Sequence, residues 1–96
     1  MSKKIRWLDL ALSDLDELLD FIARDNSRAA ASIAQKIWAT TQMLQDHPAM
    51  GKPGRVPGTR EMVTPGTAYV IPYRVVHDEI QILRVLHGAR KWPDRF

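Results

Sequence analysis

The stretch Thr67-Ala-Tyr-Val-Ile-Pro-Tyr-Arg-Val-Val-His-Asp-Glu-Ile-Gln-Ile-Leu-Arg-Val-Leu-His-Gly-Ala-Arg90 decides the fold of this chain. It contains two runs rich in Val, Ile, Leu and Tyr, which are separated by the short polar break His77–Glu79. Such runs on either side of a short break are typical of an antiparallel β-hairpin. The second run leads into His87, Arg90 and Lys91, and Gly88 allows the chain to turn sharply among them. We therefore expect a hairpin that carries a chemically active cluster at the end of its second strand.

The composition is that of one globular domain spanning residues 1–96, with 45% hydrophobic and 26% charged residues. The absence of cysteine excludes disulfides and thiolate metal sites, and the three histidines lack metal-ligand spacing. We expect neither a metal nor another cofactor. No apolar run suits a signal peptide or a membrane span, so we expect a cytoplasmic protein.

The charge is unevenly distributed along the chain. The formal net charge is +3, and residues 51–96 hold eight basic and four acidic side chains, against six and seven in residues 1–50. The basic excess therefore belongs to the C-terminal half, where it favours acidic or polyanionic partners.

Two amphipathic helices are predicted before residue 48. In the first helix, apolar residues recur at steps of three and four: Leu12, Leu15, Leu18, Leu19 and Ile22. This spacing predicts one buried stripe. We expect Asp9 or Ser13 to cap the first helix and Ser27 to cap the alanine-rich second helix. The second helix should end at His47-Pro48, because proline disfavours helical geometry in the residue before it.

The remaining segments complete the predicted fold. Short strands are expected at Lys4–Leu8 and Thr59–Thr64, and residues 48–58, with three prolines and three glycines, are expected to be loop. Lys52 and Arg55 on that loop are most simply solvated charges. The tail, Lys91–Phe96, carries two aromatic residues and should fold back onto the body. The order β-α-α-β-β-β indicates an α+β domain, in which a helical hairpin (residues 10–46) packs on a small, mostly antiparallel sheet.

Alternation along the first hairpin strand assigns its side chains to two faces. The face expected under the helices holds Tyr69, Ile71, Tyr73 and Val75, and the open face holds Val70, Pro72, Arg74 and Val76. Pro72 lacks an N–H and suits an edge strand or a bulge. Arg84 is expected either to extend from the edge of the core or to pair with an acid such as Glu61.

Several phrases in the chain form a recognisable series. They are Asp14-Leu-Asp-Glu-Leu18, His47-Pro-Ala-Met-Gly51, Arg60-Glu61, Tyr69-Val-Ile-Pro-Tyr-Arg-Val75, Ile82-Leu-Arg-Val-Leu-His-Gly-Ala-Arg90 and Trp92-Pro93. In order and spacing, this series resembles the RelE/ParE superfamily of toxins from bacterial type II toxin–antitoxin modules. The resemblance implies a growth inhibitor that is held silent, in a hetero-oligomer, by an acidic antitoxin encoded beside it.

Two activities are known in this superfamily. RelE-like members are ribosome-dependent mRNA endoribonucleases, whereas ParE-like members share the fold and inhibit DNA gyrase without hydrolysis. Where RelE-like enzymes carry lysines, a key arginine and a tyrosine, this chain has Glu61, Val63, Val70 and Phe96, and only Arg90 falls on a matching arginine. The resemblance therefore favours a ParE-like inhibitor that is not an enzyme, with a RelE-like endoribonuclease as the alternative. A third interpretation is a non-toxic antitoxin-binding module that serves operon autoregulation.

The ribonuclease interpretation implies four catalytic residues. His87 would act as acid or base, because its unperturbed pKa lies near neutrality, and Arg90, Arg74 and Arg60 would contact the phosphate. Arg74, on the neighbouring strand, is expected to join His87 and Arg90 on one face.

The gyrase interpretation implies a target-binding set instead. That set is Arg90, Lys91, Trp92 and Arg95. A purely structural interpretation makes His87 a strand-end residue hydrogen-bonded to a loop and Arg90 an ion-pair partner of the antitoxin.

Overall fold

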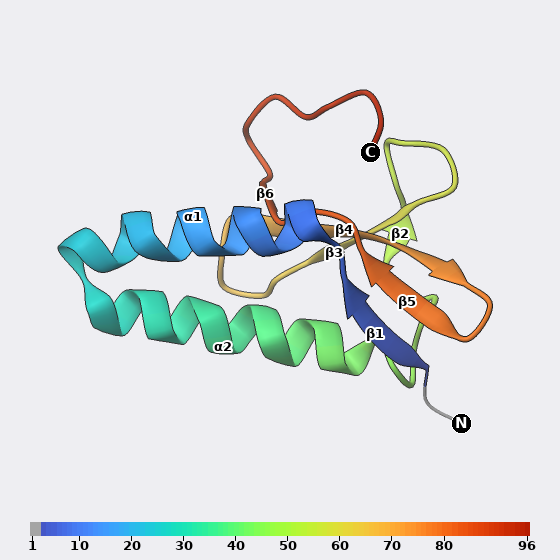
Figure 1. The fold of residues 1–96 in the computed structure, drawn as a ribbon, viewed down its shortest axis with the longest axis horizontal. Helices are drawn as coiled ribbons and strands as arrows, with labels where there is room; N and C mark the ends of the chain where they lie inside the picture. The colour runs from blue at the N-terminus through green and yellow to red at the C-terminus, as the bar shows by residue number, and fades with distance from the viewer. Residues whose placement is uncertain (1–2) are drawn as a thin grey trace.

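The computed structural model describes residues 3–96 and consists of an antiparallel pair of helices packed on a six-stranded sheet (Figure 1). The elements are β1 (Lys4–Trp7), α1 (Asp9–Asp25), α2 (Ser27–Met43), β2 (Lys52–Pro53), β3 (Arg60–Val63), β4 (Tyr69–Val76), β5 (Glu79–Ile82) and β6 (Leu86–His87). The strands lie in the order β1-β5-β4-β3-β2, and β6 also pairs with β4. β1 is parallel to β5, and the other pairings are antiparallel. The predicted α+β fold is confirmed.

The structure adds two short strands to the predicted order. β6 continues the second hairpin run after an interruption. β2 lies inside residues 48–58, where only loop is predicted, so the prediction is wrong at Lys52–Pro53. Its proline is tolerated because β2 lies at the edge of the sheet, where a missing N–H costs no ladder hydrogen bond.

The helix ends differ from their predicted positions by a few residues. α1 begins at Asp9, so the cap position is Leu8, which makes no side-chain capping bond. α2 is capped by Asn26, whose Oδ1 accepts from the Ala29 N–H at 3.0 Å, and the predicted cap Ser27 is already helical. α2 ends at Met43, before His47-Pro48.

The early end of α2 has a tertiary cause. The fully buried Leu44 forms a tight turn with Thr41, and Gln45 exchanges hydrogen bonds with the main chain of Lys3. These contacts draw the chain away from the helix axis. Neither α1 nor α2, the helices found within residues 3–96, is long and apolar enough to cross a membrane.

The core lies between the helices and one face of the sheet. Its most buried members, each at most 1% exposed, are Ala11, Ile37, Leu44, Ile71, Tyr73, Ile80 and Ile82. Each large aliphatic side chain here contributes roughly 1.5–3 kcal/mol by leaving water. The predicted helix-facing set is confirmed for Tyr69, Ile71 and Tyr73. Val75 lies near the hairpin turn and is 39% exposed.

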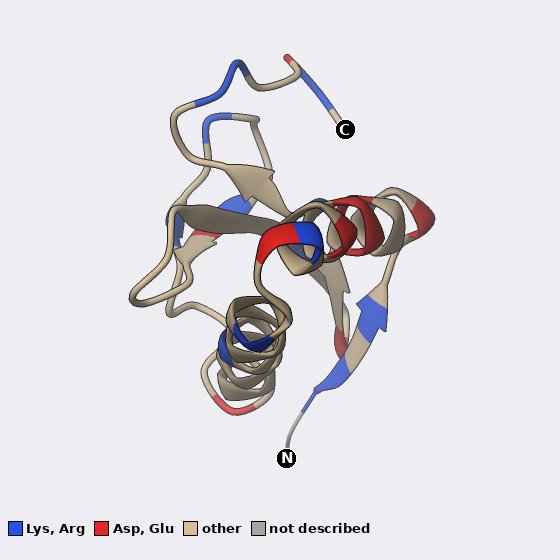
Figure 2. Cartoon of the chain, turned by 90° about the vertical axis from the view of Figure 1, so that its left-hand side faces the viewer, with Lys and Arg blue, Asp and Glu red and all other residues tan. Residues whose placement is uncertain are grey.

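The opposite face of β4 is covered rather than open. Val70 is 7% exposed and Pro72 is fully buried, which corrects the prediction of an open face at these positions. The C-terminal tail and the loop between β2 and β3 lie on the side of the sheet away from α2 (Figure 2). The tail therefore folds back as predicted through Trp92, whereas Phe96 stays 39% exposed.

A bulge separates β5 from β6. Ile82 lies opposite Tyr73 and Leu86 lies opposite Val70, so three residues face two residues of β4. The Pro72 carbonyl accepts from the Leu83 N–H at 2.9 Å, but Pro72 has no N–H to return a bond on that side. The proline in the centre of the sheet is accommodated by this bulge, one of the two settings that its sequence context predicts.

Tyr73 ties the segment after α2 to the sheet. Its hydroxyl donates to the Pro48 carbonyl at 2.8 Å and accepts from the Gly51 N–H at 2.9 Å. Gly51 must be a glycine here, because a Cβ would lie 2.7 Å from the tyrosine ring and hydroxyl. Burial raises the pKa of Tyr73 above its ordinary 10.0, although the Gly51 hydrogen bond and the charge of Arg60 each lower it.

We expect Tyr73→Phe to lower the free energy of unfolding by roughly 1–3 kcal/mol at neutral pH, because two buried main-chain groups lose their partner. Since the folded-state pKa is raised, the contribution of the tyrosine is complete below pH 10.0 and is lost as the pH rises through the folded-state value. Urea denaturation at neutral and alkaline pH measures both effects. Tyr69→Phe is the control, because the Tyr69 hydroxyl makes no hydrogen bond within residues 3–96. Identical alkaline profiles for the wild type and Tyr73→Phe would contradict this assignment.

The turn between β4 and β5 holds a strained residue. Val76 pairs with Glu79, so His77 and Asp78 form a two-residue connection. His77 has a φ of 56° and is the one non-glycine residue with positive φ in the described chain, 3–96. Positive φ at the first central position alone is the pattern of a type II′ hairpin turn.

We expect His77→Gly to raise the free energy of unfolding by about 0.5–1 kcal/mol, because a residue with a Cβ loses roughly 1–2 kcal/mol in this conformation and glycine recovers part of that. Asp78→Gly is the matched control and should be destabilising, since its φ is not positive. Urea titration of both variants decides the point. A His77→Gly variant that is less stable than the wild type would show that the backbone of His77 is not strained.

Candidate functional site

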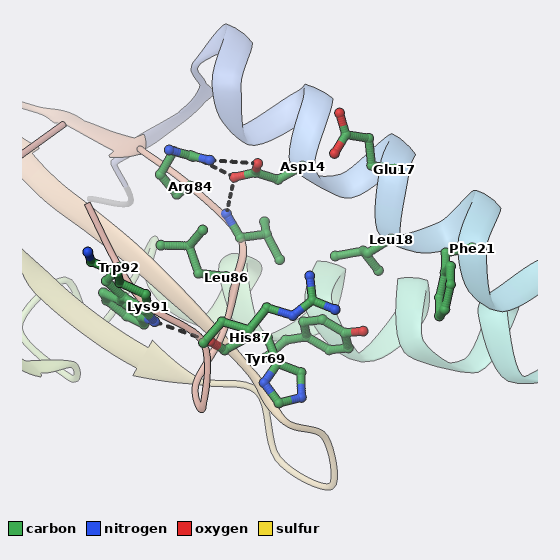
Figure 3. A pocket seen from close by; sticks show the side chains of 12 residues that line it. Asp14, Glu17, Leu18, Phe21, Tyr69, Arg84, Leu86, His87, Lys91 and Trp92 are labelled. Atoms are coloured by element: carbon green, nitrogen blue, oxygen red, sulfur yellow. Dashed lines mark hydrogen bonds and ion pairs between the residues drawn. The ribbon is translucent and has the colours of Figure 1, made fainter.

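A hollow of about 700 Å³ lies between α1 and the segment that follows the bulge (Figure 3). The α1 wall is formed by Asp14, Glu17, Leu18 and Phe21. The opposite wall carries His87, Arg90, Lys91 and Trp92, and Tyr69 of β4 also lines the hollow. It thus has one acidic and apolar wall and one basic and aromatic wall.

Asp14 fixes the position of these two walls. Its carboxylate accepts from Arg84 Nε at 2.7 Å, from the second guanidinium nitrogen at 2.9 Å and from the Val85 N–H at 3.0 Å. These hydrogen bonds raise the pKa of Arg84, outweighing the opposite effect of its partial burial. The prediction that Arg84 pairs with an acid is correct, but Glu61 is the wrong partner, because the bulge turns Arg84 toward α1.

His87 is held by four neighbours. Its ring packs edge-on against Tyr69 with centroids 5.7 Å apart, and its Nδ1 accepts from the Ala89 N–H at 3.1 Å. Its carbonyl accepts from the Arg90 N–H and from Trp92 Nε1, both at 3.1 Å. These bonds make the His87–Arg90 turn.

Gly88 does not supply the positive φ that a sharp glycine turn needs. Among residues 3–96 the glycines with positive φ are Gly58 and Gly66. At Gly88 a Cβ would lie 3.4 Å from both the Ala68 carbonyl oxygen and a Val70 methyl, which is ordinary van der Waals contact. The chain turns there through hydrogen bonds rather than through glycine geometry.

The four residues of the ribonuclease interpretation are not brought together. His87 lies opposite Tyr69, whereas Arg74 lies five positions further along β4, roughly 17 Å away at strand spacing. Arg74 donates to the Gln81 side chain at 2.6 Å. Arg60 donates to the Gly51 carbonyl at 2.8 Å and supports the loop held by Tyr73. The expectation that Arg74 joins His87 and Arg90 is therefore wrong.

Three of the four predicted target-binding residues share the hollow. Arg90, Lys91 and Trp92 line it, and Arg95 lies beyond it in the exposed tail. The prediction that Arg55 is simply a solvated charge is wrong, because its guanidinium lies 3.7 Å from the centre of the Trp92 ring and pairs with Glu61. No spacing in the sequence joins a loop arginine to a tryptophan in the tail. Within residues 3–96 no group of three or more His, Asp or Glu could hold a metal ion.

Comparison with known proteins identifies the family. The profile described as the ParE toxin of the type II toxin–antitoxin system parDE matches residues 5–92. The Sinorhizobium fredii protein named "Putative toxin Y4kP" is 42% identical over 91 residues, covering 95% of this chain and 94% of that protein. This chain belongs to the ParE toxin family of type II toxin–antitoxin systems, within the RelE/ParE superfamily that its sequence resembles.

Solved structures agree with this assignment. A chain of the chromosomal ParDE system from P. aeruginosa superposes with a TM-score of 0.79 at 29% identity, covering 90% of this chain and 96% of its own length. A chain of the RelBE2 toxin–antitoxin complex from Mycobacterium tuberculosis superposes with a TM-score of 0.63 at 28% identity. The match covers 91% of this chain and 99% of that chain. Both branches of the superfamily are thus structural relatives.

We expect Asp14→Asn to lower the free energy of unfolding by roughly 2–3 kcal/mol, because the carboxylate anchors a partly buried arginine and a main-chain amide. Hydrogen exchange at the Val85 amide should accelerate at the same time. Asp16→Asn, at an exposed position of α1, is the control and should change stability by no more than about 0.5 kcal/mol. Equal stabilities of the two variants would show that the Asp14 contacts do not hold the bulge.

Proposed function

We propose that this toxin arrests growth by binding DNA gyrase without hydrolysing a substrate, and that a cognate acidic antitoxin neutralises it in the cytoplasm. The observation that carries the proposal is the dispersal of the basic residues. Arg60 is engaged with main-chain carbonyls, and Arg74 lies on a distant part of the sheet. A phosphate bound near His87 would therefore meet Arg90 and Lys91 but neither of these arginines.

The state of His87 supports the same conclusion. Cleavage of RNA through the 2′-hydroxyl needs one group that takes a proton and another that gives one. Because Nδ1 accepts a main-chain N–H, the neutral ring carries its proton on Nε2. In that state His87 can donate a hydrogen bond into the hollow but cannot accept a proton at Nε2. The geometry therefore suits binding better than general base catalysis.

The hollow offers a binding surface of mixed character. Arg90 and Lys91 present positive charge beside the Trp92 ring, and aromatic and arginine side chains dominate the energetics of many protein interfaces. Arg95 extends the positive charge along the tail. We assign target binding to these four residues. The solved ParDE and RelBE2 relatives are toxin–antitoxin systems, which supports a cognate antitoxin as the second partner.

The runner-up function is a RelE-like, ribosome-dependent mRNA endoribonuclease. Two observations favour it: His87 and Arg90 line the same hollow, and the RelBE2 complex is a structural relative. In this alternative His87 would be the proton-transfer group and Arg90 the phosphate ligand.

The deciding experiment induces the toxin without its antitoxin and follows growth, plasmid supercoiling, the SOS response and new 5′ ends in mRNA. We expect growth arrest with SOS induction, disturbed supercoiling and intact messages. The double variant Arg90→Ala/Lys91→Ala should lose at least about tenfold in potency, since one or two interface contacts are worth about 1.4 kcal/mol or more. His87→Gln should retain most of the arrest.

The matched control is Arg28→Ala, an exposed arginine near the start of α2 and outside the hollow. It should behave as the wild type. New cuts phased to translated codons, abolished by His87→Gln, would overturn the gyrase proposal and establish the ribonuclease. Purified gyrase that supercoils normally with the toxin present would also count against it.

A further inference from the structure

Glu61 is a buried carboxylate that the proposed function does not use. It lies in β3 at 3% exposure, and its Oε2 accepts from the Arg55 N–H at 2.7 Å. Its Oε1 lies 3.6 Å from Arg55 Nε and makes no hydrogen bond within residues 3–96. Burying a carboxylate is costly, and a buried ion pair often adds less stability than apolar side chains of similar size would. The geometry that the pair imposes on Arg55 is therefore of more interest than its contribution to stability.

Trp92 connects the Glu61–Arg55 pair to the hollow. Arg55, held by Glu61, stacks over the Trp92 ring at 3.7 Å, and Trp92 Nε1 donates to the His87 carbonyl at 3.1 Å. Arg55 itself is half exposed, with 50% of its side-chain surface accessible. A chain of contacts thus runs from β3 through the loop and the tail to the end of β6.

Arg90 and Lys91 lie in the sequence between the last two members of this chain of contacts, His87 and Trp92. The His87 carbonyl accepts both the Arg90 N–H and Trp92 Nε1. The segment after His87 belongs to neither helix nor strand, so these contacts hold it in place. A loss of the stacking on Trp92 should therefore loosen the segment that carries Arg90 and Lys91.

We infer that Arg55 and Glu61 are positioning residues, which act through Trp92 to fix Arg90 and Lys91 in the orientation that binds the target. This inference rests on the proposed function, in which those two side chains contact the target. The planar guanidinium suits the role, because it can stack on an aromatic ring while its nitrogens remain available to a carboxylate. A lysine at position 55 would keep the positive charge but could not stack as a flat group on the Trp92 ring.

The test uses toxin made by cell-free synthesis with 5-fluorotryptophan, which gives separate ¹⁹F signals for Trp7, Trp38 and Trp92; Trp92→Phe assigns the third. We expect Arg55→Ala to shift and narrow the Trp92 signal while the other two stay in place as internal controls of folding. Hydrogen exchange at the Arg90 amide should rise at least about tenfold. Arg55→Lys should give intermediate values.

Lys52→Ala is the matched control, because Lys52 is an exposed cation of β2, three residues before Arg55. It should leave the Trp92 signal and the exchange rates unchanged. Glu61→Gln should shift the Trp92 signal less than Arg55→Ala does, since the amide still accepts from the Arg55 N–H. Should Glu61→Gln fail to fold, the Arg55 variants still decide the question, because their side chain is half exposed.

A growth assay measures the inducer concentration that each variant needs to arrest growth. Arg55→Ala should need an inducer concentration several times higher than the wild type or Lys52→Ala. An unchanged Trp92 signal and unchanged exchange in Arg55→Ala would overturn the inference, as would a loosened tail with undiminished potency. The spectroscopic readouts do not depend on the target. A loosened tail combined with arrest through mRNA cleavage would therefore refute the gyrase proposal while leaving the positioning role intact.

Discussion

The carboxylate of Asp14 joins two parts of this molecule that lie 70 residues apart in the chain. Its bonds to Arg84 and to the Val85 amide attach α1 to the interruption between β5 and β6. That interruption allows Pro72 to occupy the central strand, and it sets the register in which His87 faces Tyr69. The position of the basic wall of the hollow therefore depends on one acid–base pair. Because both partners are partly buried, neither can be replaced alone without leaving the other uncompensated.

Much of the fold can be predicted from the sequence, because apolar residues recur at regular spacings along its helices and strands. The three-and-four spacing of the first helix correctly predicts that Leu15 and Leu18 pack on the core, although Leu12 is 46% exposed. The alternation in β4 correctly predicts its helix-facing side chains but not the burial of its opposite face. One error falls where the competing states are almost equal in free energy, since Asn26 and Ser27 are about equally good capping residues. The early end of α2 depends on Gln45 meeting Lys3, 42 residues away, which no local pattern shows.

Of the candidate site, only the residues that are close together in the sequence can be predicted from it. His87, Arg90, Lys91 and Trp92 are gathered because they are neighbours in the chain, so a sequence argument finds them together. Whether Arg74 joins them depends on strand register, which a one-residue bulge decides. The pairs Asp14 with Arg84 and Arg55 with Trp92 are products of the tertiary fold alone. The residues that set the geometry of the hollow are thus harder to predict than those that line it.

The parallel pairing of β1 with β5 has a consequence for folding during synthesis on the ribosome. The ribosome makes Lys4–Trp7 75 residues before its hydrogen-bonding partner Glu79–Ile82. Until then the first strand has an unpaired edge and the helices have no finished sheet to cover. A nascent chain interrupted before residue 79 lacks both this pairing and the basic segment beyond it. The sheet and the hollow beside it can therefore be completed only after residues 79–92 have been translated.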